Sequence, residues 1–318
     1  MPVKTVPAVP APSPWDFAFG SDLMSDSVSR GITQSNHRPA VTAYFEPRYN
    51  ISSNLQLYAG IAGDSIDSPN HAAAEIDLYS GIRRTFDRLA LDFGFWYYAY
   101  PGGTNYNGLG PTSPPVPPAT LGSNATCANI VVAMPLAALG PGCQTAKGNS
   151  SYWEVYAKPT FAINDYLAAG ANFFYSPSWT NSGAYGIYSS GILKLSAPST
   201  WLANGMGAYL SGEFGHYWFG TTDSFYGTML FPAGIKYPDY NTWNVGIGFT
   251  KGVFTLDLRY SQTDLSKSDC AVLTSDQTAA LGGVAAASAT NPGGFISNWC
   301  GPAFIVRLSA DLTSASLR

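Results

Sequence analysis

The sequence has few charged residues and no long hydrophobic run. Asp, Glu, Lys and Arg make up 11% of its 318 residues, against about 25% in a typical soluble domain. A soluble chain of this size would have too little charge to cover its surface. The most apolar run, 130–139, is short and contains Pro135, whereas a membrane-spanning helix needs roughly 18 apolar residues. These absences exclude a helical membrane protein and disfavour a soluble one.

Basic clusters and closely spaced metal ligands are also absent. The net charge of −4 gives no electrostatic basis for binding nucleic acid. No Cys-x-x-Cys spacing occurs, and His37, His71 and His216 are scattered, so we predict no metal site and no cofactor. His37 and His71 precede and follow Asp67 and Asn70 in expected loops, and an adventitious shared cation is the alternative to plain solvated loop residues.

The sequence contains no recognisable catalytic group. A hydrolase needs a serine, a histidine and an acid within hydrogen-bond reach, and no Gly-x-Ser-x-Gly motif precedes a helix. His216 is the only histidine on an expected strand, near its outer end. We therefore predict that the protein is not an enzyme.

Hydrophobic and aromatic residues are abundant. They account for 46% and 14% of the chain, with 20 Tyr and 33 Gly, which excludes a disordered protein. A membrane protein with few charges and no spanning helix has one architecture left, because only a closed β-barrel also satisfies every backbone group in lipid.

Alternation with a period of two recurs along the chain and predicts β-strands. Over 254–261, Phe254, Leu256, Leu258 and Tyr260 alternate with Thr255, Asp257, Arg259 and Ser261. Each expected strand is long enough to cross a bilayer, which takes about 9–11 residues. The twelve expected strands are 15–26, 39–50, 55–66, 74–86, 89–100, 151–164, 166–178, 183–196, 205–219, 240–250, 253–265 and 303–314.

Two further patterns distinguish a membrane barrel from a soluble sandwich, which also alternates. The apolar faces carry no charge, and all four glutamates lie on the opposite faces. Tight turns at 51–54, 87–88, 164–165 and 251–252 alternate with connections that include the long loops 101–150, 220–239 and 266–302. Short turns on one side and long loops on the other are typical of outer-membrane barrels. We predict an all-β, closed antiparallel transmembrane barrel in a Gram-negative bacterial outer membrane, with both termini periplasmic.

The first fourteen residues differ in composition from the rest. Pro7, Pro10, Pro12 and Pro14 predict an extended polyproline leader, with a spacer that binds a periplasmic partner as the alternative. No apolar signal segment precedes it, which fits either a cytosolic protein or the mature form of an exported one. The composition favours the mature exported form. The predicted organisation is a leader over 1–14 and a single barrel over 15–318.

The four cysteines form two separated pairs. Cys127 and Cys143 fall in one long loop, and Cys270 and Cys300 in another. Three connectivities are open in principle. Because each local pair lies within one loop, we predict two local disulfides in an oxidising compartment, each contributing about 3 kcal/mol.

Several motifs resemble a known family. The chain has Ser21-Asp22, then SRGITQS over 29–35, YAG over 58–60, AEIDLYSG over 74–81, YYAYPG over 97–102 and WEVY over 153–156. These resemble the signature of the TorF family of porins. The resemblance implies an outer-membrane barrel with a transport function. Ser27 and Ser29 stand where the signature usually has aromatics, and the 101–150 loop is longer.

The polar strand faces predict a charged lumen. Facing charges away from lipid avoids about 2–4 kcal/mol for each cation at the midplane. Tyr44, Tyr58, Tyr79, Tyr98, Tyr156 and Tyr209 lie between these charges, as hydrogen-bonded spacers or as a sliding surface for flat solutes. The predicted lining residues are Glu46, Glu75, Asp77, Asp92, Glu154, Glu213, Asp257 and Asp311, with Arg48, Arg83, Lys158, Lys194, Arg259 and Arg307.

Barrel size alone leaves the function open. About eight strands give a filled interior and 16–18 an aqueous channel, so twelve lie between. We predict a porin-like channel for passive diffusion of small hydrophilic solutes, with weak selectivity because acids and bases nearly balance. The alternative is a closed structural or adhesive barrel in which these residues pair across the lumen. The expected partners are outer-membrane lipid and the solutes, and a homo-oligomer is left open.

Overall fold

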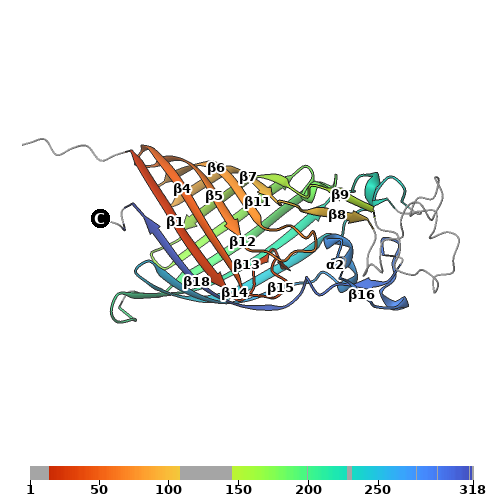
Figure 1. Ribbon diagram of the computed structural model, residues 1–318. Coiled ribbons are helices and arrows are strands. Elements are labelled where there is room, and N and C mark those ends of the chain that lie inside the picture. Colours follow the sequence, from red (N-terminus) through yellow and green to blue (C-terminus); the bar gives the residue numbers. More distant parts are fainter. Residues whose placement is uncertain are drawn as a thin grey trace, which may run out of the picture.

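The protein is a closed antiparallel barrel of twelve strands, as a computed structural model shows (Figure 1). The structure describes residues 14–107, 145–198, 200–227, 231–276, 278–291, 293–314 and 316. The predicted fold is confirmed, and each predicted strand segment corresponds to one strand of the barrel. The strands are β1 (Trp15–Met24), β4 (Ala40–Ser52), β5 (Leu55–Asp64), β6 (Glu75–Phe86), β7 (Leu89–Ala99), β10 (Tyr152–Ala162), β11 (Leu167–Ser176), β12 (Gly186–Ser196), β13 (Met206–Phe219), β14 (Tyr240–Lys251), β15 (Phe254–Thr263) and β18 (Ala303–Thr313).

Each barrel strand pairs with its neighbours in the chain, and β1 pairs with β18 to close the cylinder. The first and last strands therefore start and finish at one end, which we call the terminal end (Figure 1). At the opposite end, the loop end, lie helix α2 (Lys267–Thr274) and two small hairpins. These hairpins pair β8 (Thr104–Asn107) with β9 (Thr145–Gly148), and β16 (Ala280–Leu281) with β17 (Phe295–Ile296).

Part of the sequence prediction lies outside the described residues. This applies to the leader up to residue 13, to Cys127 and Cys143, and to the apolar run 130–139. Within the described part of the chain, no helix is both long enough and apolar enough to cross a membrane.

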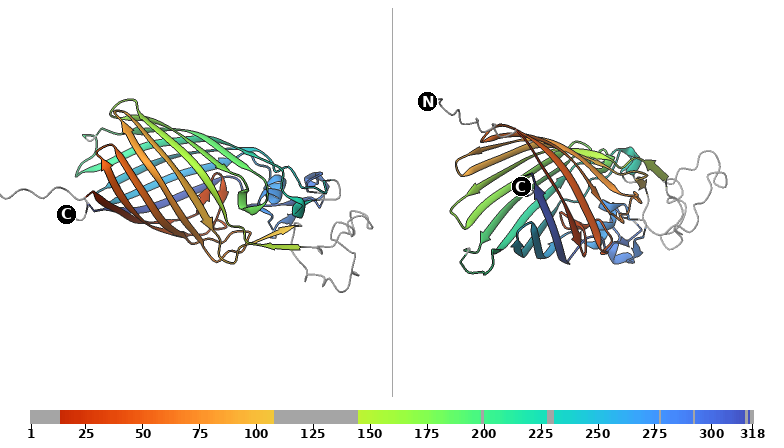
Figure 2. Two further views of the ribbon diagram at one scale, coloured as in Figure 1. Left: turned by 90° about the horizontal axis from the view of Figure 1, so that it is seen from above. Right: turned by 60° about the vertical axis from the view of Figure 1, so that its left-hand side comes forward.

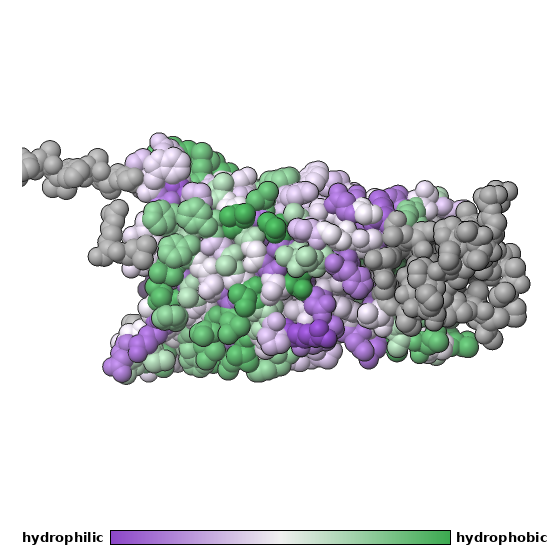
Figure 3. Space-filling view, in the orientation of Figure 1, coloured by the Kyte–Doolittle hydropathy of each residue, from purple (hydrophilic) through white to green (hydrophobic). Residues whose placement is uncertain are grey.

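The outer wall of the barrel is apolar. Figure 3 shows hydrophobic side chains spread over the strands. Phe45, Ile61, Phe93, Phe214 and Leu308 are each about half exposed, although large apolar side chains normally bury themselves in water. A wall of this kind needs a hydrocarbon environment, as in transmembrane barrels.

Tyrosine rings lie over glycines on the inner face of this wall. Gly60 is directly opposite Tyr79, and Gly248 directly opposite Tyr209. A Cβ atom at Gly60 would lie 2.2 Å from Cζ of Tyr79, and one at Gly248 would lie 2.1 Å from Cζ of Tyr209. Each ring therefore occupies the space that a neighbouring side chain would fill. Aromatic–glycine pairs of this kind fix strand register and keep the rings along the wall.

Two prolines, Pro47 in β4 and Pro159 in β10, interrupt the pairing of their strands without shifting it. Pairing of β4 with β5 is interrupted at Pro47, and pairing of β10 with β11 at Pro159, yet the register is the same on both sides. Each proline lacks the N–H that one ladder bond requires. The register shift of β4 occurs later, between Asn50 and Ser52.

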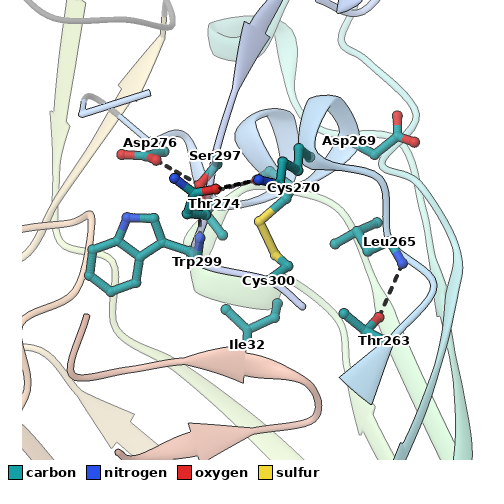
Figure 4. Close-up of a disulfide and its surroundings, with 12 residues drawn as sticks. Ile32, Thr263, Leu265, Asp269, Cys270, Thr274, Asp276, Ser297, Trp299 and Cys300 are labelled. Carbon is teal, nitrogen blue, oxygen red and sulfur yellow. Dashed lines mark hydrogen bonds between the residues drawn. A yellow bond between two sulfur atoms is a disulfide. The ribbon is translucent and has the colours of Figure 1, made fainter. Parts of the chain in front are cut away.

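One predicted disulfide is confirmed. Cys270 of α2 is bonded to Cys300, which precedes β18, with their Cα atoms 5.9 Å apart. Ser266 caps α2 by accepting a hydrogen bond from the Asp269 N–H at 3.0 Å. Figure 4 shows Ile32 beside this bridge, and Ile32 also pairs with Cys300 as an isolated β-bridge. The disulfide thus fastens the last long loop next to a segment from the first loop.

Replacing Gly60 by Leu should destabilise the barrel by about 1–3 kcal/mol, because the new side chain would overlap the Tyr79 ring. The measurement is the urea unfolding midpoint of the protein in lipid vesicles. Gly63→Leu on the same strand is the control, since no atom lies within 4 Å of a Cβ there. Equal midpoints for the two variants would contradict the role assigned to the Tyr–Gly pair.

Candidate functional site

A short hairpin from the first loop enters the barrel. Strands β2 (Val28–Ser29) and β3 (Ile32–Thr33) flank a turn at Arg30 and Gly31, and both turn residues have positive φ, 49° and 81°. Figure 2 shows this red hairpin within the outline of the barrel near the loop end. Gly31 is required because its φ disfavours other residues and a Cβ there would lie 2.8 Å from Oγ1 of Thr242.

Arg30 at the tip of the hairpin binds the far wall of the lumen. Its guanidinium donates to both carboxylate oxygens of Glu154, at 2.8 and 2.7 Å, and to the hydroxyl of Tyr217 at 2.8 Å. It also lies 4.4 Å from the ring centre of Phe174 and 4.8 Å from that of Tyr188. These partners belong to β10, β11, β12 and β13, so one side chain joins the loop hairpin to four adjacent strands.

The Arg30–Glu154 ion pair is buried. Glu154 has no exposed surface, and it also accepts a hydrogen bond from the Tyr98 hydroxyl at 3.1 Å. Burial acts to lower the pKa of Arg30, but the charge of Glu154 and its hydrogen bond outweigh it and raise that pKa well above its ordinary value. The bidentate geometry of the two hydrogen bonds is that of the strong arginine–carboxylate pairs.

Aromatic side chains close the space around the hairpin towards the loop end. Tyr217 stacks on Phe219 with ring centres 4.1 Å apart, and Tyr237 packs edge-on against Phe219 at 6.0 Å. Tyr240 donates a hydrogen bond to the Arg30 carbonyl at 2.9 Å. The cluster continues through the disulfide and the buried face of α2. A cavity of about 110 Å³ remains beside it, with Arg30, Asn70, Glu75, Tyr100 and Asn105 in its lining.

The terminal half of the lumen holds ion pairs that run along the wall. Glu46 accepts from Arg83 at 2.7 and 3.1 Å and from Arg48 at 2.6 Å. Arg83 also contacts Asp92 at 3.2 Å and lies 3.7 Å from the ring centre of Tyr58. Because these partners lie on the four consecutive strands β4 to β7, the charges stay against one side of the barrel instead of bridging it.

The opposite side of the terminal half encloses polar space. A cavity of about 260 Å³ has Lys194, Tyr209, Ser211, Glu213, Asn244 and Arg259 in its lining. Arg259 pairs with Asp257 at 3.0 Å and donates to Ser211 at 2.8 Å. Glu213 accepts only from neutral groups in the described structure, including the Tyr188 hydroxyl at 3.0 Å. Charged and hydrogen-bonding groups therefore surround the space between the hairpin and the terminal end.

All fourteen charged residues predicted to line the lumen fall at inner-face positions of the strands. Most are held by the contacts above, Asp311 accepts from Tyr44 at 2.7 Å, and Arg307 is directly opposite Asp257. Lys158 lies 4.3 Å from the ring centre of Tyr156. That a solute passes them stays a prediction. The fourteen are Glu46, Arg48, Glu75, Asp77, Arg83, Asp92, Glu154, Lys158, Lys194, Glu213, Asp257, Arg259, Arg307 and Asp311.

Sequence reasoning missed Arg30. The residue stands inside the SRGITQS motif, but β2 and β3 have two residues each and show no alternation. The one available signal was the Arg-Gly dipeptide within a conspicuous motif. His216, the histidine predicted near the outer end of its strand, lies on the outer side of β13, and its ring centre is 4.4 Å from that of Trp218.

His37 links the first loop to the last one. Its Nδ1 lies 2.8 Å from Oδ2 of Asp26, and its Nε2 lies 2.9 Å from the carbonyl oxygen of Asn298. Both ring nitrogens are thus engaged, which argues against the cation that His37 and His71 were considered to share. Partial burial lowers the pKa of His37, but the Asn298 carbonyl and the Asp26 carboxylate outweigh it and raise that pKa overall.

This link should weaken at alkaline pH. A raised pKa means that the folded loop binds the proton more tightly, so the contribution of His37 is full below its unfolded pKa of about 6.5 and is lost as pH rises through the folded value. Hydrogen exchange of 25–39, corrected for intrinsic rates, should therefore show more protection at pH 6 than at pH 9. His37→Ala should abolish the difference and His71→Ala should keep it. A difference that persists in His37→Ala would contradict the assignment.

Comparison with known proteins gives a partial family match. Residues 8–115 match a family described as "Bacterial protein of unknown function (Gcw_chp)". This segment contains the hairpin and most of the motifs quoted above, whereas the TorF name stays a prediction. No curated protein matches the chain.

Several solved outer-membrane proteins resemble the chain in structure. The NanC porin is 8% identical, with a TM-score of 0.41, over 94% of this chain and 100% of that one. The COG4313 outer membrane channel from Pseudomonas putida F1 is 11% identical, with a TM-score of 0.41, over 98% and 100%. The P. putida toluene transporter TodX is 10% identical, with a TM-score of 0.40, over 95% and 90%. Similarity this low leaves function to be argued from the geometry of this chain.

Proposed function

We propose that the protein is an outer-membrane channel for passive diffusion of small hydrophilic solutes, closed at its loop end by the β2–β3 hairpin. The observation that carries this proposal is the Arg30–Glu154 pair, in which a loop residue reaches through the lumen to the wall. In this proposal both termini are periplasmic, residues 1–14 form a tether, 15–318 form one barrel, and lipid surrounds the wall.

The lining of the terminal half supports a path for polar solutes. Its cavity is bordered by charged and hydroxyl groups, and the Tyr–Gly pairs keep bulky rings flat against the wall. Charged rings of this kind set the ion preference of a channel by their field. Since most arginines here are paired with acids, we propose that the channel has weak ion selectivity. We also propose that the protein has no enzymatic activity and that the lumen tyrosines act as hydrogen-bonded spacers.

The hairpin supplies the gate in this proposal. Removing one partner of a buried ion pair typically costs about 3–5 kcal/mol because the other charge is left uncompensated, so the closed form requires Arg30 and Glu154 together. The hairpin itself is short, and the loop that carries it is joined to the last loop through His37. Withdrawal of the hairpin would connect the two cavities without any change in the barrel strands.

A closed structural or adhesive barrel is the second candidate, and the same ion pair favours it if the hairpin never leaves. The two candidates differ in one respect. A channel opens when the contact of the hairpin with the wall is removed, whereas a closed barrel does not conduct even then.

Planar-bilayer recording tests the gate. The double variant Arg30→Ala with Glu154→Gln removes the contact without leaving a buried unpaired carboxylate, and should raise the mean conductance several-fold over the wild type. Arg38→Ala is the control, because Arg38 lies in the same loop but its pair with Asp67 is exposed. No conductance above lipid alone in wild type or double variant would support the closed barrel. Equal conductance above the lipid background in the wild type and the double variant would show that the hairpin is not the gate.

Reversal potentials test the lining. Arg307→Glu should shift the reversal potential towards cation selectivity, because it replaces a positive charge with a negative one on the inner face near Asp257, a net change of two charge units. Arg88→Glu in the turn after β6 is the control, since its guanidinium binds the Ile163 carbonyl at 3.0 Å, outside the barrel strands. An unchanged potential in Arg307→Glu would place that residue away from the path of the ions.

A further inference from the structure

Three carboxylates meet on the inner face at the loop end of β5 and β6. Asp64 ends β5 and Glu75 begins β6, and the two are directly opposite in the register. Asp77 follows two residues later on the same face. One carboxylate oxygen from each of the three lies within 4.8 Å of the other two. Oxygens bound to a single cation have separations in this range.

These carboxylates have no positive partner among the described residues. Glu46, Glu154 and Asp257 each form an ion pair with an arginine, whereas no ion pair involves Asp64, Glu75 or Asp77 in the described part of the chain. Like charges directly opposite each other destabilise a sheet, and a buried charge without compensation is costly. Asp22 adds a further negative charge near Asp64, and Arg307 acts on it without forming a pair. The cluster therefore lacks a counter-charge.

Asp77 supplies a second and independent observation. It is 5% exposed, and its Oδ1 atom accepts no hydrogen bond of normal geometry in the described structure, although the Trp96 indole lies near enough to act on its charge. Glu75, in contrast, accepts from the Tyr100 hydroxyl at 3.1 Å, and Asp64 accepts from the Thr42 hydroxyl. Buried acceptors almost always have a partner. An unpaired carboxylate oxygen inside an acidic cluster points to a bound cation.

The cluster is reachable from the cavity beside the hairpin. Glu75 lines that cavity of about 110 Å³, together with the polar side chains of Asn70 and Asn105. A space of this size holds several water molecules. A cation could enter from this side and keep part of its hydration shell there while the carboxylates bind the other part.

We propose that Asp64, Glu75 and Asp77 form a binding site for a calcium ion. All three ligands are carboxylates, which hard divalent cations prefer. Ca²⁺ accepts 6–8 oxygens in irregular arrangements and can take the remainder from water, whereas Mg²⁺ demands near-ideal octahedral geometry at a shorter distance. The ion neutralises the facing acids and joins the ends of β5 and β6 beside the gate. The site does not depend on whether the barrel conducts.

Calorimetric titration of the full chain in detergent, after chelator treatment, tests the proposal. CaCl₂ should bind at one saturable site, and Asp77→Asn should weaken binding at least ten-fold. Asp67→Asn is the matched control, because this exposed acid lies in the loop between β5 and β6 and pairs with Arg38. It should leave the affinity for Ca²⁺ unchanged.

A second measurement guards against a folding defect in the variant. Tb³⁺, which replaces Ca²⁺ at oxygen sites, should luminesce in the wild-type protein on excitation of nearby tyrosine, since Tyr100 contacts Glu75. Added Ca²⁺ should quench this emission by displacing Tb³⁺. No saturable Ca²⁺ binding by the wild type would overturn the site. So would emission that Ca²⁺ leaves unchanged, or equal affinities in wild type and a folded Asp77→Asn variant.

Discussion

Closure of the sheet by β1 and β18 is the constraint on which every other feature of this protein depends. In hydrocarbon an unpaired backbone N–H or C=O costs several kcal/mol, so an open sheet edge is not tolerated. Pairing from Ala18 with Thr313 to Met24 with Arg307 removes the last two edges. Once the cylinder is closed, alternate side chains have only two destinations, lipid or lumen. The apolar set covers the outside, and every inner carboxylate then requires compensation in a confined space.

The inner carboxylates are compensated in different ways. Glu46, Glu154 and Asp257 are paired with arginines, and Glu213 accepts hydrogen bonds from neutral hydroxyl and amide groups. In the cluster at the ends of β5 and β6, no acid is paired with an arginine among the described residues; Glu75 and Asp64 each accept one hydrogen bond from a hydroxyl, and Oδ1 of Asp77 accepts none. These differences follow from the neighbours that the register brings to each acid, because the arginines of the strands bind partners on their own strand or within two strands of it. Among the described residues, Arg30 is the one loop arginine that binds a carboxylate of the barrel wall from within the lumen.

The barrel could be predicted from the sequence because a two-residue period and alternating turn lengths report directly on strands and their two faces. Residues such as Phe254 and Asp257 reveal their sides by position alone, and so do the fourteen lumen charges. The hairpin could not be predicted in this way. Arg30 reaches Glu154 across 124 positions and Tyr217 across 187, and nothing local in Ser29-Arg30-Gly31 indicates those partners. Strand periodicity likewise says which face an acid occupies but not whether an arginine lies within reach.

The long-range contacts of the hairpin bear on the order in which the molecule assembles. The hairpin follows β1 directly and is synthesised early, yet its partners lie on β10 to β14 and its neighbour Cys300 precedes the final strand. It can therefore reach its final position only when the later strands have come round to meet β1. Closure of the barrel and insertion of the β2–β3 hairpin into the lumen then become a single late folding step. Non-local strand pairing of this kind is typically slow, so the hairpin is inserted on the same slow timescale.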